Sequence, residues 1–249
     1  MPGTIDRLPD LHVLPTRRAL GRQAGAVAAD AVRTVLAERG SARIMLAAAP
    51  SQEETLKVFA ASPDIDWSAV ELFHMDDYVG LAPDAPQGFA NWLQTVVVDH
   101  MPGATFHRID TSAEPEEAAR QYEHTMGDEP FDLVFLGLGV NGHLAFNDPP
   151  ADLADPRGAK VVALDEICRQ QQVDEGHFPT LDDVPPTAIT VTIPRLLNAT
   201  EVIASVPGTA KRKAVANTLN QPISGDHPGT ALRTHPRVTM FLDTESDPR

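Results

Sequence analysis

The sequence has one cysteine, few cations and no long apolar run, and each shortage argues against a class of protein. Cys168 is the single cysteine among 249 residues, which excludes an intramolecular disulfide and a cysteine-based metal cluster. The formal net charge of −15 argues against a nucleic-acid partner, whose phosphates would be repelled. No apolar run approaches the roughly 18–20 residues of a transmembrane helix, and the N-terminus lacks a signal-peptide pattern. These features predict a soluble, cytoplasmic protein with no membrane partner.

The length and composition are those of a globular enzyme. A chain of 249 residues can form one large α/β domain or two small ones, and 42% hydrophobic with 22% charged residues is ordinary. Proline-rich stretches are spread out and no internal repeat is visible, which favours one domain over residues 1–249. The acidity adds a requirement, because an anionic ligand would need a local cluster of cations or backbone N–H groups.

Apolar runs alternate with segments of helical periodicity along most of the chain. The expected strands are residues 42–49, 70–75, 105–109, 131–138, 187–193, 201–206 and 238–242. The expected helices are residues 16–40, 53–61, 88–100, 114–126 and 209–219. This alternation predicts an α/β three-layer sandwich with a mainly parallel, Rossmann-like central sheet. Residues 150–186 have mixed polarity and several prolines, and are expected to form an irregular excursion or a mobile lid.

The segment FDLVFLGLGVNGHLAFNDPP, residues 131–150, is the clearest candidate for a functional site. Its first eight residues read as a fully buried strand of a parallel sheet. Asn141, His143 and Asp148 follow just past the carboxyl end of this strand, where open α/β sheets bind ligands. His143 and Asp148 could ligate a metal, but no further His or Cys has a convincing ligand spacing, so no metal is expected.

Two other strand ends carry polar side chains. In AAAPSQ, Ser51 and Gln52 stand at the start of a helix, whose N-terminus suits a phosphate, although an ordinary helix cap is an equal alternative. In FHMDDYVGL, Asp76 and Asp77 follow a buried strand. A carboxylate in a partly dry cleft can have a raised pKa and act as a general base, and a turn-forming Asp pair is the alternative.

Lys211 lies in the densest cationic run of this acidic chain, within SVPGTAKRKA. A strand there meets a glycine and then the start of a helix, so Lys211 could reach an anion held at neighbouring helix N-termini. The alternative is that this run is a solvated helix face. Gly139, in the turn before His143, would let a ligand approach the backbone.

Taken in order, FHMDDYVGL, LGLGVNGHLAFNDPP and PGTAK resemble the glucosamine-6-phosphate deaminase (isomerase) family, which is related to the 6-phosphogluconolactonases. The resemblance covers most of the chain, and its middle motif is the most specific, because lactonases share only the G-H core. It implies isomerisation and deamination of an amino-sugar 6-phosphate, glucosamine 6-phosphate giving fructose 6-phosphate and ammonia, with no metal or organic cofactor. The alternatives are a lactonase-like hydrolase and a non-catalytic sugar-phosphate-binding member.

The same resemblance implies a role for individual residues. Asp76 would be the base for proton transfer from C2 to C1, and His143 the acid–base group that opens the sugar ring. Asn141 and Asp148 would set the orientation and basicity of the imidazole. Ser51 and Lys211 would hold the phosphate. The full set of implied substrate-binding residues is Ser51, Gln52, Asp77, Gly139, Lys211 and Arg169.

The sequence departs from the family pattern mainly at the phosphate end. Ala48, Ala49 and Pro50 replace a glycine-rich loop, and the proline removes one N–H donor. Asp148 replaces a glutamate and is one methylene shorter. The segment ICRQQQVDEG keeps Arg169 but lacks the other residues of the arginine motif. Little chain follows the last strand to build a large interface, so the expected assembly is a monomer or a small homo-oligomer.

Overall fold

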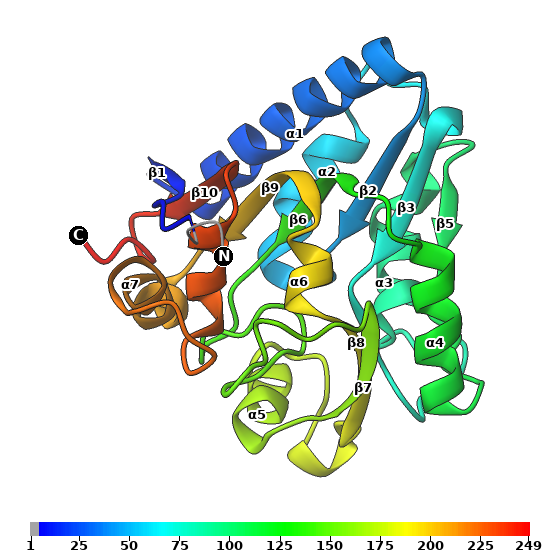
Figure 1. The fold of residues 1–249 in the computed structure, drawn as a ribbon, viewed down its shortest axis with the longest axis vertical. Coiled ribbons are helices and arrows are strands. Elements are labelled where there is room, and N and C mark those ends of the chain that lie inside the picture. Colours follow the sequence, from blue (N-terminus) through cyan, green and yellow to red (C-terminus); the bar gives the residue numbers. More distant parts are fainter. Residues whose placement is uncertain (1–4) are drawn as a thin grey trace.

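The computed structural model describes residues 5–249. Its core is a parallel sheet of seven strands in the order β1-β10-β9-β6-β2-β3-β5 (Figure 1). These strands are β1 (Asp10–Leu14), β2 (Ala42–Leu46), β3 (Val70–His74), β5 (Thr105–His107), β6 (Phe131–Leu136), β9 (Ala199–Val206) and β10 (Val238–Asp243). The α/β class and the mainly parallel central sheet predicted from the sequence are confirmed.

Helices cover both faces of this sheet and complete the three layers. They are α1 (Arg17–Arg39), α2 (Glu53–Ala60), α3 (Phe89–Val96), α4 (Pro115–Met126), α5 (Glu166–Asp174), α6 (Ile193–Leu196) and α7 (Arg212–Asn220). Because successive strand residues point to opposite faces, β2 contributes to two separate cores. Ile44 and Leu46 pack in the core that includes buried residues of α1, α2 and α3, whereas Met45 packs in the core with α4, α6 and α7.

A second, antiparallel sheet corrects one sequence-based expectation. Its strands follow the order β4 (Asp76–Tyr78), β8 (Thr187–Val191) and β7 (Ala159–Ala163). The predicted strand at 187–193 therefore forms, but outside the main parallel sheet. Its β-branched alternation indicates a strand and does not encode a pairing partner. Main-chain pairing between Val191 N–H and the Met75 carbonyl (2.8 Å) holds β8 against the chain that leaves β3.

The excursion at 150–186 is not irregular, because it contains β7 and α5. The Asp165 carboxylate begins α5 by accepting a hydrogen bond from the Cys168 backbone N–H (2.6 Å), a helix cap. Its mobility stays a prediction. The strand β1 was also missed, since residues 10–14 read only as a lead segment. Within residues 5–249, this short edge strand pairs only with β10.

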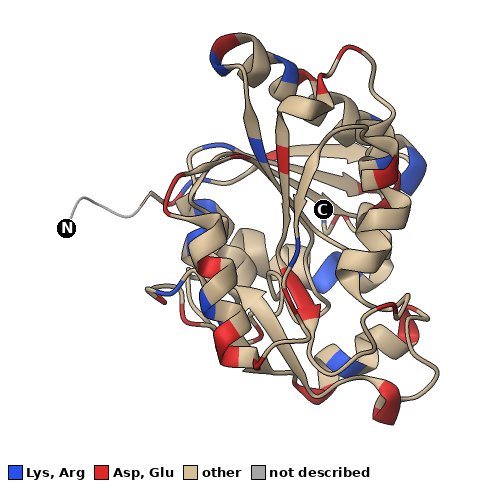
Figure 2. Cartoon of the chain, turned by 90° about the vertical axis from the view of Figure 1, so that its right-hand side faces the viewer, with Lys and Arg blue, Asp and Glu red and all other residues tan. Residues whose placement is uncertain are grey.

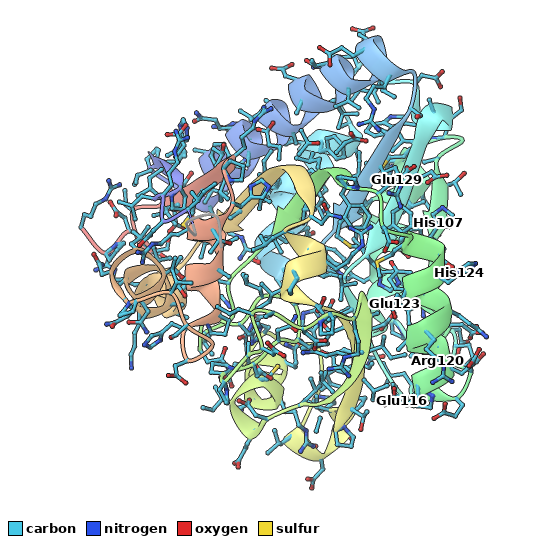
Figure 3. All side chains as sticks on the ribbon, in the orientation of Figure 1. His107, Glu116, Arg120, Glu123, His124 and Glu129 are labelled. Atoms are coloured by element: carbon cyan, nitrogen blue, oxygen red, sulfur yellow. The ribbon has the colours of Figure 1, made fainter. Side chains whose placement is uncertain are left out.

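The outer face of α4 carries mixed charge and lies apart from the site described below. Acidic and basic residues are interspersed on this side of the molecule (Figure 2), and the exposed side chains of Glu116, Arg120 and His124 project from α4 (Figure 3). None of these three lines the pocket at the carboxyl edge of the sheet. Among residues 5–249, no helix combines the length and apolarity needed to span a membrane.

Candidate active site

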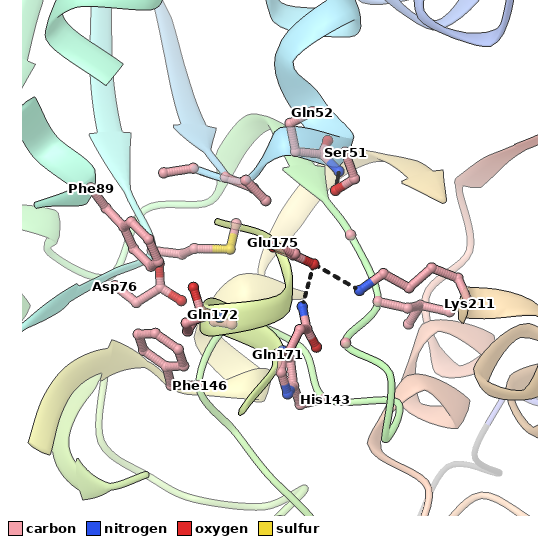
Figure 4. A pocket seen from close by; sticks show the side chains of 18 residues that line it. Ser51, Gln52, Asp76, Phe89, His143, Phe146, Gln171, Gln172, Glu175 and Lys211 are labelled. Atoms are coloured by element: carbon pink, nitrogen blue, oxygen red, sulfur yellow. Dashed lines mark hydrogen bonds and ion pairs between the residues drawn. The ribbon is translucent and has the colours of Figure 1, made fainter. Parts of the chain in front are cut away.

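A pocket lies at the carboxyl edge of the central sheet, where the loops after β2, β3, β6 and β9 meet α5 (Figure 4). The predicted residues that line it are Ser51, Gln52, Asp76, Gly139, His143 and Lys211. The segment that includes α5 adds Gln171, Gln172 and Glu175, which the sequence did not single out as site residues. Parallel strands thus bring four segments, far apart in the chain, to one edge of the sheet.

Asp76 is the first residue of β4, and its carboxylate points into the pocket (Figure 4). Only 5% of the residue is exposed. Burial, and then the charge of Asp77, raise the pKa of Asp76 well above its usual range. A carboxylate with a raised pKa holds a proton more tightly once it has accepted one, which suits a general base.

His74 fixes the main chain at Asp76, a contact that the sequence did not reveal. Its Nε2 accepts a hydrogen bond from the Ile109 backbone N–H (2.9 Å), so the proton of the neutral ring sits on Nδ1. That Nδ1–H donates to the Asp76 carbonyl oxygen (2.9 Å). Burial lowers the pKa of His74, which favours this neutral ring. Two bonded ring nitrogens make His74 a positioning residue for Asp76.

Asp77 points away from the pocket, so its predicted contact with substrate is not supported by the structure. Its carboxylate accepts hydrogen bonds from the backbone N–H groups of Tyr78 (2.9 Å), Phe89 (2.9 Å) and Ala90 (3.0 Å). Adjacent strand residues face opposite sides, and Asp76 occupies the pocket side. Asp77 therefore ties β4 to the N-terminus of α3, where a carboxylate is also favoured by the helix dipole.

The turn after β6 joins His143, Asp148 and Asn141 in one hydrogen-bonded group. Asp148 Oδ1 lies 2.8 Å from His143 Nδ1 and accepts a second hydrogen bond from Asn141 Nδ2 (2.9 Å). The Asn141 side-chain oxygen in turn accepts from the His143 backbone N–H (3.0 Å). An ionised Asp148 favours the tautomer with the proton on Nδ1, which leaves Nε2 of His143 to exchange a proton with a ligand.

The ionised state of Asp148 follows from its partners. Burial opposes ionisation of this carboxyl, but hydrogen bonds from His143 and Asn141 outweigh it and hold the pKa of Asp148 below its usual range. The 2.8 Å distance to His143 Nδ1 also shows that the shorter side chain of aspartate still reaches the imidazole. Asn141 and Asp148 can act here without touching a ligand, because they fix the imidazole ring of His143.

Two glycines shape this turn for different reasons. Gly142 has a φ of 90°, a conformation that favours glycine, and so it makes the reversal before His143 possible. Gly139 has no positive φ. A Cβ at Gly139 would lie 2.3 Å from His143 Nε2, because the imidazole packs against this residue's Cα. The close approach that Gly139 allows in this structure is that of the His143 ring, and contact between Gly139 and a ligand stays a prediction.

We expect Gly139→Ala to lower kcat by about 10²-fold, the cost of misplacing a catalytic group by roughly 1 Å. The added methyl group must push the His143 ring away from Asp148 or off its rotamer. Steady-state kinetics with the substrate proposed below, beside a thermal unfolding curve, check this. A kcat within twofold of the wild type in a folded variant would show that the ring position is not critical.

Ser51, Gln52 and Lys211 form the opposite end of the pocket. Gln52 Nε2 donates to the Ser205 carbonyl (2.9 Å) and to Ser51 Oγ (3.2 Å), so Gln52 holds the serine in place. Lys211 Nζ lies 3.5 Å from Glu175 Oε1. Burial lowers the pKa of Lys211, and the Glu175 charge offsets part of that effect.

Arg169 does not reach this pocket. Its guanidinium donates to the carbonyl oxygens of Leu181 (2.6 Å) and Val184 (3.0 Å), which closes the loop after α5. The arginine predicted to bind substrate is thus a structural residue in this conformation. The position of Arg169 in the sequence, one turn before Gln172 in α5, does not distinguish a structural arginine from one that binds substrate.

One group of side chains has the composition of a metal site. The ligand atoms of His143, Asp148 and Cys168 all lie within 4.8 Å of one another. Burial raises the pKa of the Cys168 thiol, which disfavours the thiolate that a metal needs. Since Asp148 already accepts the His143 hydrogen bond, the geometry favours a hydrogen-bonded pair, and the absence of a metal stays a prediction.

A buried base, an imidazole–carboxylate pair and a buried lysine around one pocket, at the carboxyl edge of a parallel sheet, define an α/β enzyme of acid–base chemistry. The chain belongs to the family described as glucosamine-6-phosphate isomerases/6-phosphogluconolactonase, whose model matches residues 15–240. The resemblance found in the three motifs is thereby confirmed at the level of the family.

Similar proteins point to one branch of this family. A glucosamine-6-phosphate deaminase of Streptococcus sanguinis is 31% identical over 225 residues, covering 90% of this chain and 93% of the relative. The deaminase of Streptococcus pneumoniae serotype 4 is also 31% identical, covering 90% of this chain and 94% of its own. Among solved structures, a monomeric glucosamine-6-phosphate deaminase superposes with a TM-score of 0.86 at 27% identity, over 95% of this chain and 98% of that one. A 6-phosphogluconolactonase from Shewanella baltica superposes with a TM-score of 0.81 over 96% and 100%, but at 17% identity it shows only the shared fold.

Proposed function

We propose that this protein deaminates glucosamine 6-phosphate, giving fructose 6-phosphate and ammonia. The observation that carries the proposal is the pocket itself, which places Asp76, His143 and Lys211 around one cavity. The deaminases at 31% identity, together with the deaminase structure, support this substrate. The reaction needs a ring-opening acid–base group, a base at C2 and a site for a phosphate, and the pocket offers residues for each.

Ring opening is assigned to His143. Its Nε2 is the proton acceptor, because the Nδ1–H of the ring donates to the Asp148 carboxylate. The imidazole takes the proton of the C1 hydroxyl and returns a proton to the ring oxygen, so the open-chain aldehyde forms without net proton change. The carboxylate of Asp148 stabilises the imidazolium that exists between these two transfers.

Isomerisation is assigned to Asp76. Its carboxylate removes the proton from C2 of the open-chain amino aldehyde while the C1 oxygen takes up a proton, which gives an enolamine. The protonated Asp76 then returns its proton to C1, which leaves a hydroxyl at C1 and a protonated imine at C2. Water then adds to that imine and ammonia leaves, giving the ketose. The raised pKa of Asp76 brings the base closer to the acidity of the carbon it deprotonates.

The phosphate is assigned to the end formed by Ser51 and Lys211. A hydroxyl fixed by Gln52 and a buried ammonium group can hold a phosphate oxygen each. The pairing of Lys211 with Glu175 means that this ammonium is not free in the structure described here.

The acid limb of the pH profile for kcat/KM is expected to report Asp76. A base must be unprotonated to act, and burial and Asp77 raise the pKa of Asp76, so activity falls as pH drops through a value well above that of an ordinary aspartate. Asp77→Asn removes one cause of the rise, and its acid limb should lie at lower pH than the wild type's. Comparing both proteins on the same substrate cancels the ionisation of the substrate itself. An unchanged limb in a folded variant would mean that another group controls it.

A lactonase-like hydrolase is distinguished from a deaminase by a paired assay. The same preparation is given 6-phosphogluconolactone and glucosamine 6-phosphate, and acid release and ammonia release are followed. We expect turnover of the amino sugar at least about 10²-fold faster than any lactone hydrolysis above the uncatalysed rate. Faster hydrolysis of the lactone than turnover of the amino sugar would identify the protein as a lactonase. Binding of both compounds without turnover of either would identify it as a sugar-phosphate-binding protein.

The proposed assembly is a monomer or a small homo-oligomer that acts on a small-molecule sugar phosphate. The similarity to a monomeric deaminase supports the smaller size. Light scattering of the eluted protein should give the mass of one or two chains.

A further inference from the structure

Glu175 occupies a position where it competes with a phosphate for Lys211. The Glu175 side chain lies just past the end of α5 and points between Lys211 and Gln171 (Figure 4). Its Oε1 lies 3.5 Å from Lys211 Nζ and accepts a hydrogen bond from Gln171 Nε2 (2.8 Å). His177 Nε2 lies 3.9 Å from its other carboxylate oxygen. The carboxylate is therefore held in place by the Gln171 hydrogen bond and the Lys211 ion pair.

The ion pair stands between two cavities. The inner one, lined by Asp76 and His143, has a volume of about 60 Å³. An outer groove of about 540 Å³, which includes Val140 and Ile167, lies on the other side. Gln171, Glu175 and Lys211 line both cavities, so they form the wall between them.

The inner cavity is too small for a sugar phosphate while α5 is in this position. A volume of 60 Å³ has room for a few water molecules, whereas ordinary ligand pockets measure about 300–1,000 Å³. Polar contacts join α5 to the pocket wall through Gln171 Oε1, which accepts from the Val140 N–H (3.0 Å), and through the Glu175–Lys211 pair. Movement of α5 enlarges the cavity only if the ion pair breaks.

We propose that Glu175 sets the phosphate affinity of this site by acting as an internal competitor, and that its ion pair with Lys211 holds α5 over the pocket until a phosphate displaces it. The inference rests on the assignment of Lys211 to the phosphate in the proposed function. A phosphate dianion and the Glu175 carboxylate cannot share one ammonium group at close range without strong repulsion. Binding of the phosphate and release of α5 are therefore coupled.

The test uses inorganic phosphate as the probe, with its dissociation constant measured by calorimetry. Glu175→Gln keeps the size of the side chain and removes the charge, and should bind phosphate about tenfold more tightly than the wild type. Asp174→Asn is the matched control, because this neighbouring carboxylate is exposed and contacts Gln170 rather than Lys211. It should stay within twofold. Lys211→Met should weaken phosphate binding in both the wild-type and Glu175→Gln backgrounds.

A second measurement follows α5 directly. Cys168 is the only cysteine in the chain, is fully buried and lies on α5, so its rate of reaction with a chromogenic disulfide reagent reports release of this helix. We expect Glu175→Gln to raise that rate about tenfold and Asp174→Asn to leave it unchanged. Phosphate should raise the rate in the wild type and have less than a twofold effect in Glu175→Gln.

Equal phosphate affinity and equal thiol reactivity in the wild type and Glu175→Gln would overturn the proposal, and so would slower thiol reaction of the wild type with phosphate. These outcomes do not depend on deamination. If glucosamine 6-phosphate were not turned over while the phosphate results held, the proposed function alone would fail. If turnover occurred and Glu175→Gln behaved as the wild type does, only the role of Glu175 would fail.

Discussion

Replacing Asp76 by asparagine is expected to lower kcat for glucosamine 6-phosphate by about 10³–10⁴-fold, with KM within about threefold of the wild type. The amide cannot accept the C2 proton, yet it has nearly the size of the carboxylate. In the part of the chain that the structure describes, the Asp76 carboxylate oxygens accept no hydrogen bond that would be lost. The main chain at this residue remains fixed by His74. Substrate binding therefore survives while the isomerisation step does not.

Proton exchange at C2 in deuterated water is the most specific measurement for this variant. We expect the wild type to exchange the proton and Asp76→Asn not to do so. Asp84→Asn is the control, because Asp84 is an exposed carboxylate outside the pocket, and it should retain activity within twofold. Exchange at the wild-type rate in Asp76→Asn would show that another group is the base.

Replacing His143 by glutamine is expected to lower kcat by about 10²–10⁴-fold, because the variant has no group that can both accept and return a proton at the ring oxygen. Asp148→Asn should cost less, since the imidazole remains but loses the charged partner of its Nδ1–H. Steady-state kinetics of both variants give this order. His124→Gln, on the exposed face of α4, is the control and should match the wild type. An Asp148→Asn variant slower than His143→Gln would contradict the roles given to the pair.

The motif at residues 131–150 was predictable because one short segment contains both its polar side chains and the strand that positions them. A fully apolar β6 and a turn that contains Asn141, His143 and Asp148 are read from one segment, and the parallel sheet places that turn at its carboxyl edge. The position of Asp76 in the pocket was predictable for the same reason. The buried run that ends at His74 identifies a strand end, and the pleat then directs one of two adjacent carboxylates inward.

Two predicted substrate-binding residues make other contacts in the structure, and those contacts are distant in sequence. Asp77 was expected to bind substrate, yet its partners are the N–H groups of Phe89 and Ala90 at the start of α3. Arg169 was expected to reach the phosphate, and instead it holds the carbonyls of a loop that lies beyond α5. Neither contact leaves a periodic pattern, since each depends on how a loop folds back on a helix.

Glu175 and His74 were missed for a related reason. A glutamate at the end of a polar helix is usually solvated, and only the position of α5 over the sheet edge brings it to Lys211. His74 reads as one more residue of a buried strand, and only the packing of Ile109 and the Asp76 main chain shows what its ring does. Such roles arise from packing between elements, which one sequence does not display.

Incubation of the purified protein with glucosamine 6-phosphate tests the central claim most directly. We predict that ammonia and fructose 6-phosphate appear in equal amounts, and that Asp76→Asn and His143→Gln slow the formation of both products together, each by at least about 10²-fold. No turnover of glucosamine 6-phosphate by the folded wild type, or fructose 6-phosphate formed at the same rate by Asp76→Asn, would contradict it.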